Sequence, residues 1–225
     1  MPRSQDISRA FYAGLGVKGL EARTRPEWDR EILEALRAMI PEASRVLDVG
    51  CGYGRIAVPL ATAGHLVTGV DIVPELMVEA RRRAEEARVH VEVVSASMTE
   101  LPCADASFDV VLCLWSAFHE LLEVSEQVAA VSEMWRVLAP EGFALVEGPR
   151  YAPPTDEELE SGERRGPADR WSWSLIDGYL NSHFAHDAGS LSRVARLAGV
   201  GSFSTYEGSW GGRERLFLRL DRSSR

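Results

Sequence analysis

The strongest constraint on the fold of this chain is an alternation of short apolar runs with helical stretches between residues 44 and 148. The apolar runs are SRVLDVG, LVTGVD, VHVEVVS, FDVVLCLW and PEGFALVEG, and the helical stretches lie at 55–63, 74–84 and 123–138. This alternation predicts a parallel sheet. Runs that are apolar throughout, such as DVVLCL, are expected where helices cover both faces of such a sheet. We therefore predict an α/β fold with a doubly wound, mostly parallel sheet.

The two ends of the chain add elements to this sheet. Residues 26–40 have one apolar helical face, with Pro26 at the start, Thr24 as the expected cap and Pro41 as the stop. A weaker amphipathic piece lies at 7–12. Residues 188–198 predict a helix, and STYEGSWGGRERLFLRL predicts two strands around a Gly-Gly turn. The full prediction is a seven-stranded sheet with helices on both faces.

Residues 149–187 interrupt the strand and helix rhythm with adjacent prolines, an acidic run and a group of aromatic side chains. Connections of this length in a compact domain are usually lids or binding loops. We therefore expect an inserted lid after the fifth strand, within a single domain that spans 1–225.

The overall composition excludes several classes of function. The chain has 25 Lys and Arg against 34 Asp and Glu, a net charge of −9, which disfavours nucleic acid as a partner. The apolar stretch at 110–115 is far shorter than the ~20 residues of a membrane helix. No secretory signal follows the first residues, so a cytoplasmic protein without a membrane partner is expected. Cys51, Cys103 and Cys113 lack metal-site spacing, so free thiols and no metal are expected.

The most informative motif is DVGCGYG at residues 48–54, where the first predicted strand ends and a helix opens. Its glycines allow a tight turn and a close approach of the backbone to a ligand. A dinucleotide-binding fingerprint would place its third glycine at position 55, which is Arg55 here. Asp71 ends the second strand about twenty residues after the first glycine, where a carboxylate can accept hydrogen bonds from ribose hydroxyls. These features favour an adenosine ligand over a dinucleotide.

The chain resembles the class I S-adenosylmethionine-dependent methyltransferases over residues 43–148, in five blocks that occur in the family's order. They are RVLDVGCGYGR, VTGVD, SASMTELP, SFDVVLCLWSAFHEL and MWRVLAPEGFALVE. The resemblance implies S-adenosylmethionine as cofactor, S-adenosylhomocysteine as product, and 43–148 as the cofactor-binding core. The other segments would then be an N-terminal helical cover (1–42), a substrate lid (149–187) and a final helix with a strand pair (188–225).

The resemblance also implies roles for individual residues. Asp48 would order the methionine end of the cofactor, Asp71 would take both ribose hydroxyls, and Ile72 would pack on adenine. Relatives often carry an acidic residue at the position of Ser97, so a hydroxyl or water would hold the adenine amino group here. The complete set of expected cofactor-binding residues is Asp48, Gly50, Cys51, Gly52, Gly54, Asp71, Ile72, Ser97, Met98 and Leu114.

The methyl group on a sulfonium is already activated, so an enzyme needs mainly to align a nucleophile and to remove its proton. Candidate bases are His119, which is followed by Glu120, and His183 or His186, which is followed by Asp187. The alternatives are that His119 only lines a pocket and that His186 and Asp187 only cap the next helix. An amine acceptor would need no base.

The aromatic and basic side chains of the lid could enclose an organic acceptor. The expected substrate-binding residues are Tyr12, Trp115, Arg150, Tyr151, Trp171, Trp173 and Tyr179. The predicted function is methyl transfer by in-line displacement to a hydroxyl or amine of a small organic molecule, such as a secondary-metabolite intermediate. An NAD-dependent oxidoreductase and a non-catalytic cofactor-binding relative are the alternatives, and the oligomeric state stays open.

Overall fold

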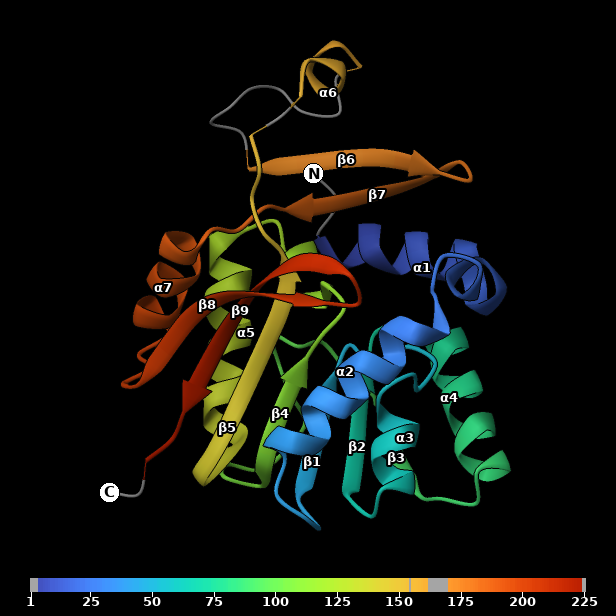
Figure 1. The fold of residues 1–225 in the computed structure, drawn as a ribbon, viewed down its shortest axis with the longest axis vertical. Helices are drawn as coiled ribbons and strands as arrows, with labels where there is room; N and C mark the ends of the chain where they lie inside the picture. The colour runs from blue at the N-terminus through green and yellow to red at the C-terminus, as the bar shows by residue number, and fades with distance from the viewer. Residues whose placement is uncertain (1–3, 154, 162–169, 224–225) are drawn as a thin grey trace.

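The computed structural model describes residues 4–153, 155–161 and 170–223, which form a twisted seven-stranded sheet between two layers of helices (Figure 1). The strand order is β3-β2-β1-β4-β5-β9-β8, and β1 to β5 run parallel. β9 is antiparallel to both β5 and β8. The predicted doubly wound, mostly parallel sheet is confirmed. The strands are β1 (Arg45–Val49), β2 (Leu66–Asp71), β3 (Val91–Ser95), β4 (Phe108–Cys113), β5 (Leu138–Pro149), β8 (Phe203–Trp210) and β9 (Arg213–Asp221).

Each face of the sheet packs on its own set of helices. One apolar cluster joins the sheet to α2 (Pro26–Met39), α3 (Ala57–Thr62) and the end of α4 (Pro74–Glu86). The other joins it to α5 (Val124–Val137) and α7 (Ala188–Leu197). Neighbouring residues of β4 show the division, since Leu112 belongs to the first cluster and Cys113 to the second. Both are fully buried, as expected for a strand covered on both faces.

The N-terminal region differs from the prediction in two details. α1 spans Ser4–Glu21, longer than the predicted 7–12, because Gly14, Gly16 and Gly19 weaken the helical pattern in the sequence. Gly16 has φ 59°, which kinks the helix there. Thr24 does not cap α2: its hydroxyl donates to the Glu21 carbonyl at 3.1 Å, and the residue before Pro26 makes no side-chain cap.

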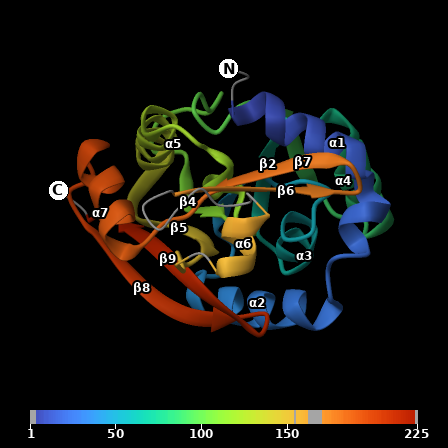
Figure 2. The same cartoon turned by 90° about the horizontal axis from the view of Figure 1, so that it is seen from above.

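The segment predicted as a lid contains regular structure. It holds α6 (Asp156–Glu160) and an antiparallel hairpin of β6 (Trp171–Ile176) and β7 (Tyr179–Phe184). Figures 1 and 2 show this hairpin above the carboxyl ends of the central strands, with its turn beside α1, against which β7 packs. Residues 154 and 162–169 of the predicted lid lie outside the described residues.

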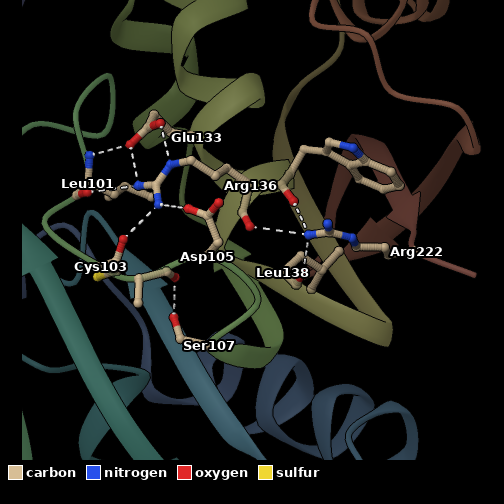
Figure 3. A network of polar contacts seen from close by, with 10 residues as sticks. Leu101, Cys103, Asp105, Ser107, Glu133, Arg136, Leu138 and Arg222 are labelled. Atoms are coloured by element: carbon tan, nitrogen blue, oxygen red, sulfur yellow. Dashed lines mark hydrogen bonds and ion pairs between the residues drawn. The ribbon is translucent and has the colours of Figure 1, made fainter. Parts of the chain in front are cut away.

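A polar network fixes the loop between β3 and β4 to α5 (Figure 3). Arg136 donates to the carbonyls of Leu101 and Cys103 and to the carboxylates of Asp105 and Glu133. The Glu133 carboxylate also accepts the Leu101 N–H at 2.7 Å. This loop begins with residues 96–98, so the network holds one wall of the site described below.

Across the described ranges, no helix combines the length and apolar character needed to cross a bilayer. The same residues contain no group of three or more His, Cys, Asp or Glu that could hold a metal ion.

Candidate cofactor and acceptor site

A cavity of about 370 Å³ lies at the carboxyl ends of β1, β2 and β4, where ligands bind in open α/β sheets. α1 and β7 cover it, and η1 (Ala117–Glu120) forms part of its wall. Such a volume suits a ligand of cofactor size. The lining includes Gln5, Ser8, Tyr12, Asp48, Gly50, Cys51, Gly52, Asp71, Ile72, Ser97, Met98, Leu114, Trp115, Glu120, Asn181, His183, Arg23, Arg55 and Arg213.

The glycine loop is a tight turn held against β2. The N–H groups of Gly50 and Cys51 both donate to the Val70 carbonyl, at 2.8 and 3.1 Å. Gly50 has φ 79°, and a Cβ added there would lie 2.7 Å from the Ala117 Cβ, so only glycine fits. Gly54 does not line the cavity. A Cβ at Gly54 would lie 3.0 Å from Val58 Cγ2, so this glycine permits helix packing, which corrects its expected cofactor role.

Asp71 connects the glycine loop with the end of β2. Its carboxylate accepts the Gly52 N–H and the Val73 N–H, both at 2.8 Å. Burial raises the pKa of Asp71, and these backbone hydrogen bonds partly oppose the shift. The residue therefore presents a buried acceptor to the cavity and also holds the loop in place.

Two further carboxyl groups, Asp48 and Glu120, make the interior of the cavity acidic. Burial, together with the nearby Asp71 carboxylate, raises the pKa of Asp48 to about 7. Burial is also the main cause that raises the pKa of Glu120 to about 7. Ionised carboxylates in a desolvated cavity favour a ligand that carries positive charge.

The wall of the cavity at the ends of β2 and β3 is completed by α1. Gln5 donates to the Ser97 hydroxyl at 2.7 Å, and the Thr99 N–H donates to the same hydroxyl at 3.0 Å. Gln5, Ser97, Met98 and Ile72 all line the cavity. This side therefore offers an amide, a hydroxyl and apolar atoms, a set that suits an adenine ring.

The three candidate histidines lie in different environments. His183 lines the cavity, with its Nε2 4.0 Å from Glu120 Oε1. His119 and His186 are completely buried outside the cavity, with ring centroids 5.0 Å apart. The expectation of a base at either position is corrected, because neither ring faces the cavity. His186 instead lies within 3.1 Å of the Ser190 hydroxyl beside the N-terminus of α7, where Asp187 makes the cap.

Glu120 turns toward α1 and β7 rather than toward His119. Its Oε1 accepts a short hydrogen bond from the Tyr12 hydroxyl and also lies 4.0 Å from the His183 Nε2. Burial lowers the pKa of His183 to about 4, with Arg215 contributing, so its imidazole is neutral at pH 7. Tyr12, Glu120 and His183 therefore form a cluster that combines a phenol, a carboxyl group and a neutral imidazole.

The expected acceptor-binding residues divide into two groups. Tyr12 and Trp115 line the cavity, whereas Arg150, Tyr151, Trp171, Trp173 and Tyr179 do not. The hairpin register explains the tryptophans: Trp173 pairs with Ser182, so it lies on the face opposite Asn181 and His183. Tyr179 packs on the outer side of α1 at Gly14. Arg150 pairs with Glu207, and Tyr151 stacks with Arg170.

The cavity also contains residues that sequence reasoning missed. Gln5 and Ser8 come from α1, Asn181 from β7, and Arg213 from the start of β9. None belongs to a motif. Asn181 could have been found from its period-two spacing to His183 if the hairpin had been predicted.

Comparison with known proteins identifies the class. Residues 46–142 match the family model described as a methyltransferase domain. The matched residues are therefore similar to a methyltransferase domain, and the solved structures that share this fold include methyltransferases whose cofactor is S-adenosylmethionine. The glycine turn and the acidic cavity suit that cofactor, because its sulfonium and amino groups are positively charged.

Individual relatives share this domain. The 27-O-demethylrifamycin SV methyltransferase of Amycolatopsis mediterranei is 38% identical over 136 residues, which are 57% of this chain and 50% of that protein. A ubiquinone biosynthesis O-methyltransferase of Rickettsia felis is 30% identical over 65% of this chain and 59% of its own length. The chain thus spans about half the length of the curated relatives that it matches.

Solved structures share the fold. The 1,6-didemethyltoxoflavin-N1-methyltransferase of Burkholderia thailandensis superposes with a TM-score of 0.67 at 20% identity, covering 97% of this chain and 88% of that one. An amino pentose methyltransferase of Micromonospora echinaspora superposes with a TM-score of 0.63 at 21% identity, covering 90% and 95%.

Proposed function

We propose that the chain transfers a methyl group from S-adenosylmethionine to a hydroxyl or amine of a small organic molecule. The observation that carries this proposal is the covered acidic cavity, which joins the glycine turn at one end to the Tyr12, Glu120 and His183 cluster at the other. A secondary-metabolite intermediate or a quinone precursor has suitable chemistry. The named relatives act on molecules of this kind.

In this proposal, the end of the cavity at the glycine turn binds the cofactor. The cofactor supplies a methyl group that the positive sulfur activates. Asp71 holds the ribose, Asp48 orders the amino-acid end, and Gln5 with Ser97 contacts the adenine. These contacts fix one reactant so that an acceptor in the same cavity meets it in line.

Glu120 is the group that we assign to proton removal. A pKa of about 7 suits a general base at neutral pH. Part of the carboxyl group is ionised at that pH, and the carboxylate is still basic enough to take a proton from the acceptor. Tyr12 donates to that carboxylate and fixes its orientation. The neutral His183 can accept a hydrogen bond from the acceptor. An acceptor that binds as a free amine does not need this step.

The cover favours a small acceptor over a polymer. α1 and β7 lie across the cavity, and the chain carries a net charge of −9. A nucleic acid would need an open basic groove, and its methylation would fall steeply with salt.

The test is a screen of small hydroxyl and amine compounds for release of S-adenosylhomocysteine, with Glu120→Gln and Asp71→Ala as variants. We expect turnover of a small molecule, little dependence on ionic strength, and loss of hydroxyl methylation in Glu120→Gln. Greater labelled-methyl incorporation into RNA or protein than into the small-molecule fraction of an extract would refute the acceptor class. Tight cofactor binding without turnover of any extract fraction would favour the non-catalytic alternative, and thermal stabilisation by NAD alone would favour an oxidoreductase.

A further inference from the structure

An arginine–tryptophan cluster, made of Trp28, Arg55, Trp115 and Arg213, forms the side of the cavity next to α2 and the β8–β9 turn. The Arg55 guanidinium carbon lies 3.6 Å from the centroid of the Trp115 ring, and that of Arg213 lies 4.1 Å from the centroid of Trp28. The two tryptophan rings are 6.4 Å apart. Arg55, Trp115 and Arg213 all line the cavity.

The β8–β9 turn fixes Arg213 in this cluster. Gly211 has φ 59°, and a Cβ placed on it would lie 3.0 Å from the Trp28 Cβ, so the turn packs closely on α2. Arg213 follows two residues later, as the first residue of β9. The guanidinium is therefore held at the cavity by the backbone of the turn and by the face of Trp28.

Positive charge in the cluster exceeds its negative charge. Arg55 pairs with Asp29, its Nε lying 2.6 Å from Asp29 Oδ1. Within the described part of the chain, no carboxylate lies within ion-pair distance of Arg213. Partial desolvation and the neighbouring Arg215, Arg25 and Arg55 lower the pKa of Arg213, and the Glu147 carboxylate opposes this shift. A bound anion would relieve this repulsion.

Two buried donors at the same wall lack a protein acceptor. The Nη2 of Arg55 and the indole Nε1 of Trp115 are inaccessible to solvent and make no hydrogen bond to the described residues. Buried donors are nearly always satisfied, so this pair leaves the wall of the cavity short of acceptor oxygens. An oxyanion has several such oxygens and a charge that complements Arg213.

We propose that the arginine–tryptophan cluster binds an oxyanion, such as a carboxylate, of the acceptor, and that the preferred acceptor is a small organic acid. This inference rests on the proposed function and adds a charge requirement to it. The acidic half of the cavity takes the positively charged cofactor, and the arginine side takes the negatively charged end of the acceptor. The planar indoles provide an apolar contact for the rest of the molecule.

The experiment compares the binding of 4-hydroxybenzoate and 4-aminobenzoate with the binding of their uncharged amides. The protein is the full chain saturated with S-adenosylhomocysteine, observed by calorimetry and by the indole N–H signals of tryptophan. Trp115→Phe assigns the Trp115 signal. We expect each acid to bind at least about tenfold more tightly than its amide and to shift that signal.

Arg213→Gln should remove the preference for the acid, whereas Arg219→Gln, the matched change farther along β9, should keep it. The proposal is overturned if the wild-type chain shows no preference, including the case in which neither compound binds. It is also overturned if Arg213→Gln keeps the preference.

A second comparison separates the acceptor from the cofactor as the source of the oxyanion. S-Adenosylhomocysteine carries a carboxylate that 5′-methylthioadenosine lacks. If Arg213→Gln weakens binding of the former only, the cluster holds the cofactor and the proposal is wrong. Methyl transfer to neutral acceptors, unaffected by Arg213→Gln, would refute this inference and leave the proposed function intact. Preferential acid binding without any methyl transfer would support the oxyanion site and refute the proposed function.

Discussion

The floor of the cavity and its cover are held in place by different kinds of contact. The floor is formed where β1, β2 and β4 end, and buried backbone hydrogen bonds and a buried ion pair between Glu147 and Arg215 fix it. The cover is α1 with the hairpin β6–β7, and an exposed pair between Arg23 and Asp177 joins its two parts. Buried contacts within a continuous sheet give rigidity, and exposed contacts between separate segments allow opening.

This difference assigns separate tasks to the two regions. The floor keeps the cofactor contacts in a fixed geometry. The cover contributes Tyr12, Asn181 and His183 to the lining of the cavity and must also admit the acceptor. We therefore predict that changes in the floor alter stability and cofactor affinity, whereas changes in the cover alter exchange rates and acceptor binding.

The largest effect is expected from breaking the buried ion pair of the floor. Glu147 accepts hydrogen bonds from Arg215 and from the Trp115 N–H, and Arg215 also donates to the Ser116 hydroxyl. Trp115 and Ser116 both have positive φ, so this network holds a strained turn. Arg215→Ala should lower the free energy of unfolding by about 3–5 kcal/mol, because the Glu147 carboxylate stays buried without its cation.

Urea unfolding measures this loss, with Arg219→Ala as the control. Arg219 lies on the same strand and pairs with Asp221, but both side chains are partly exposed. Its replacement should cost about 1 kcal/mol or less. Equal losses in the two variants would contradict the assigned role of the buried pair.

The next largest effect concerns the cofactor. Asp71→Ala removes the acceptor that we propose for the ribose and releases the N–H groups of Gly52 and Val73. Charge-assisted hydrogen bonds of this kind contribute about 1.5–3 kcal/mol, so the affinity for S-adenosylhomocysteine should fall at least about tenfold. Calorimetry on the folded variant measures this. Unchanged affinity would refute the role of Asp71, and Asp71→Asn, which keeps one acceptor oxygen, should lose less.

The same contrast explains how much the sequence could predict. The floor comes from residues close together in the chain, such as DVGCGYG, and the carboxyl ends of parallel strands meet at one edge of the sheet. Of the ten residues expected to contact the cofactor, all except Gly54 line the cavity. Gly54 belongs to the same turn, but its direction depends on the packing of α3 against α4, which the motif does not specify.

The cover depended on contacts between distant segments, so prediction was less successful there. Trp173 and His183 differ only in which face of a hairpin they occupy, and a shift of one residue in register would exchange those faces. His119 and Glu120 are neighbours in sequence, yet only Glu120 lines the cavity, because η1 turns their side chains in different directions. Arg213 reaches the site through the fold of the final strand pair, which no local pattern indicates.

A smaller effect is expected from pH. Burial, with Asp71, raises the pKa of Asp48 to about 7, and a positively charged cofactor favours the ionised form. Ionisation of Asp48 should therefore raise cofactor affinity with pH up to about 7, by at most about tenfold per pH unit, and the affinity should level off above it. In the ligand-free chain, the free energy of unfolding depends on pH with the opposite sign. The folded state keeps a proton that the unfolded state loses above pH ~4, so the free energy of unfolding should fall as pH rises from about 4 to about 7.

Calorimetry between pH 5.5 and 8.5, in buffers of different ionisation enthalpy, measures both the affinity and the proton released on binding. Asp48→Asn should reduce the slope of the affinity against pH. Glu120→Gln should remove the remaining slope, because Glu120 also has a raised pKa. An affinity independent of pH in the wild-type chain would show that neither carboxyl group changes protonation when the cofactor binds.

The smallest effect is expected in the cover, at the pair between Arg23 and Asp177. Its atoms lie 2.7 Å apart, but the side chains are 38% and 61% exposed, so solvent screens the interaction. Exposed pairs contribute about 0.2–1 kcal/mol, and Arg23→Ala with Asp177→Ala should show a coupling energy in that range.

The main consequence of breaking this pair should be in the motion of the cover rather than in global stability. Hydrogen exchange of 171–184 should be faster in either variant and slower in the wild-type chain when product and acceptor are both bound, while β1 and β4 are unaffected. If these segments exchange equally with and without ligand, or if β1 changes with them, the cover does not move separately from the floor.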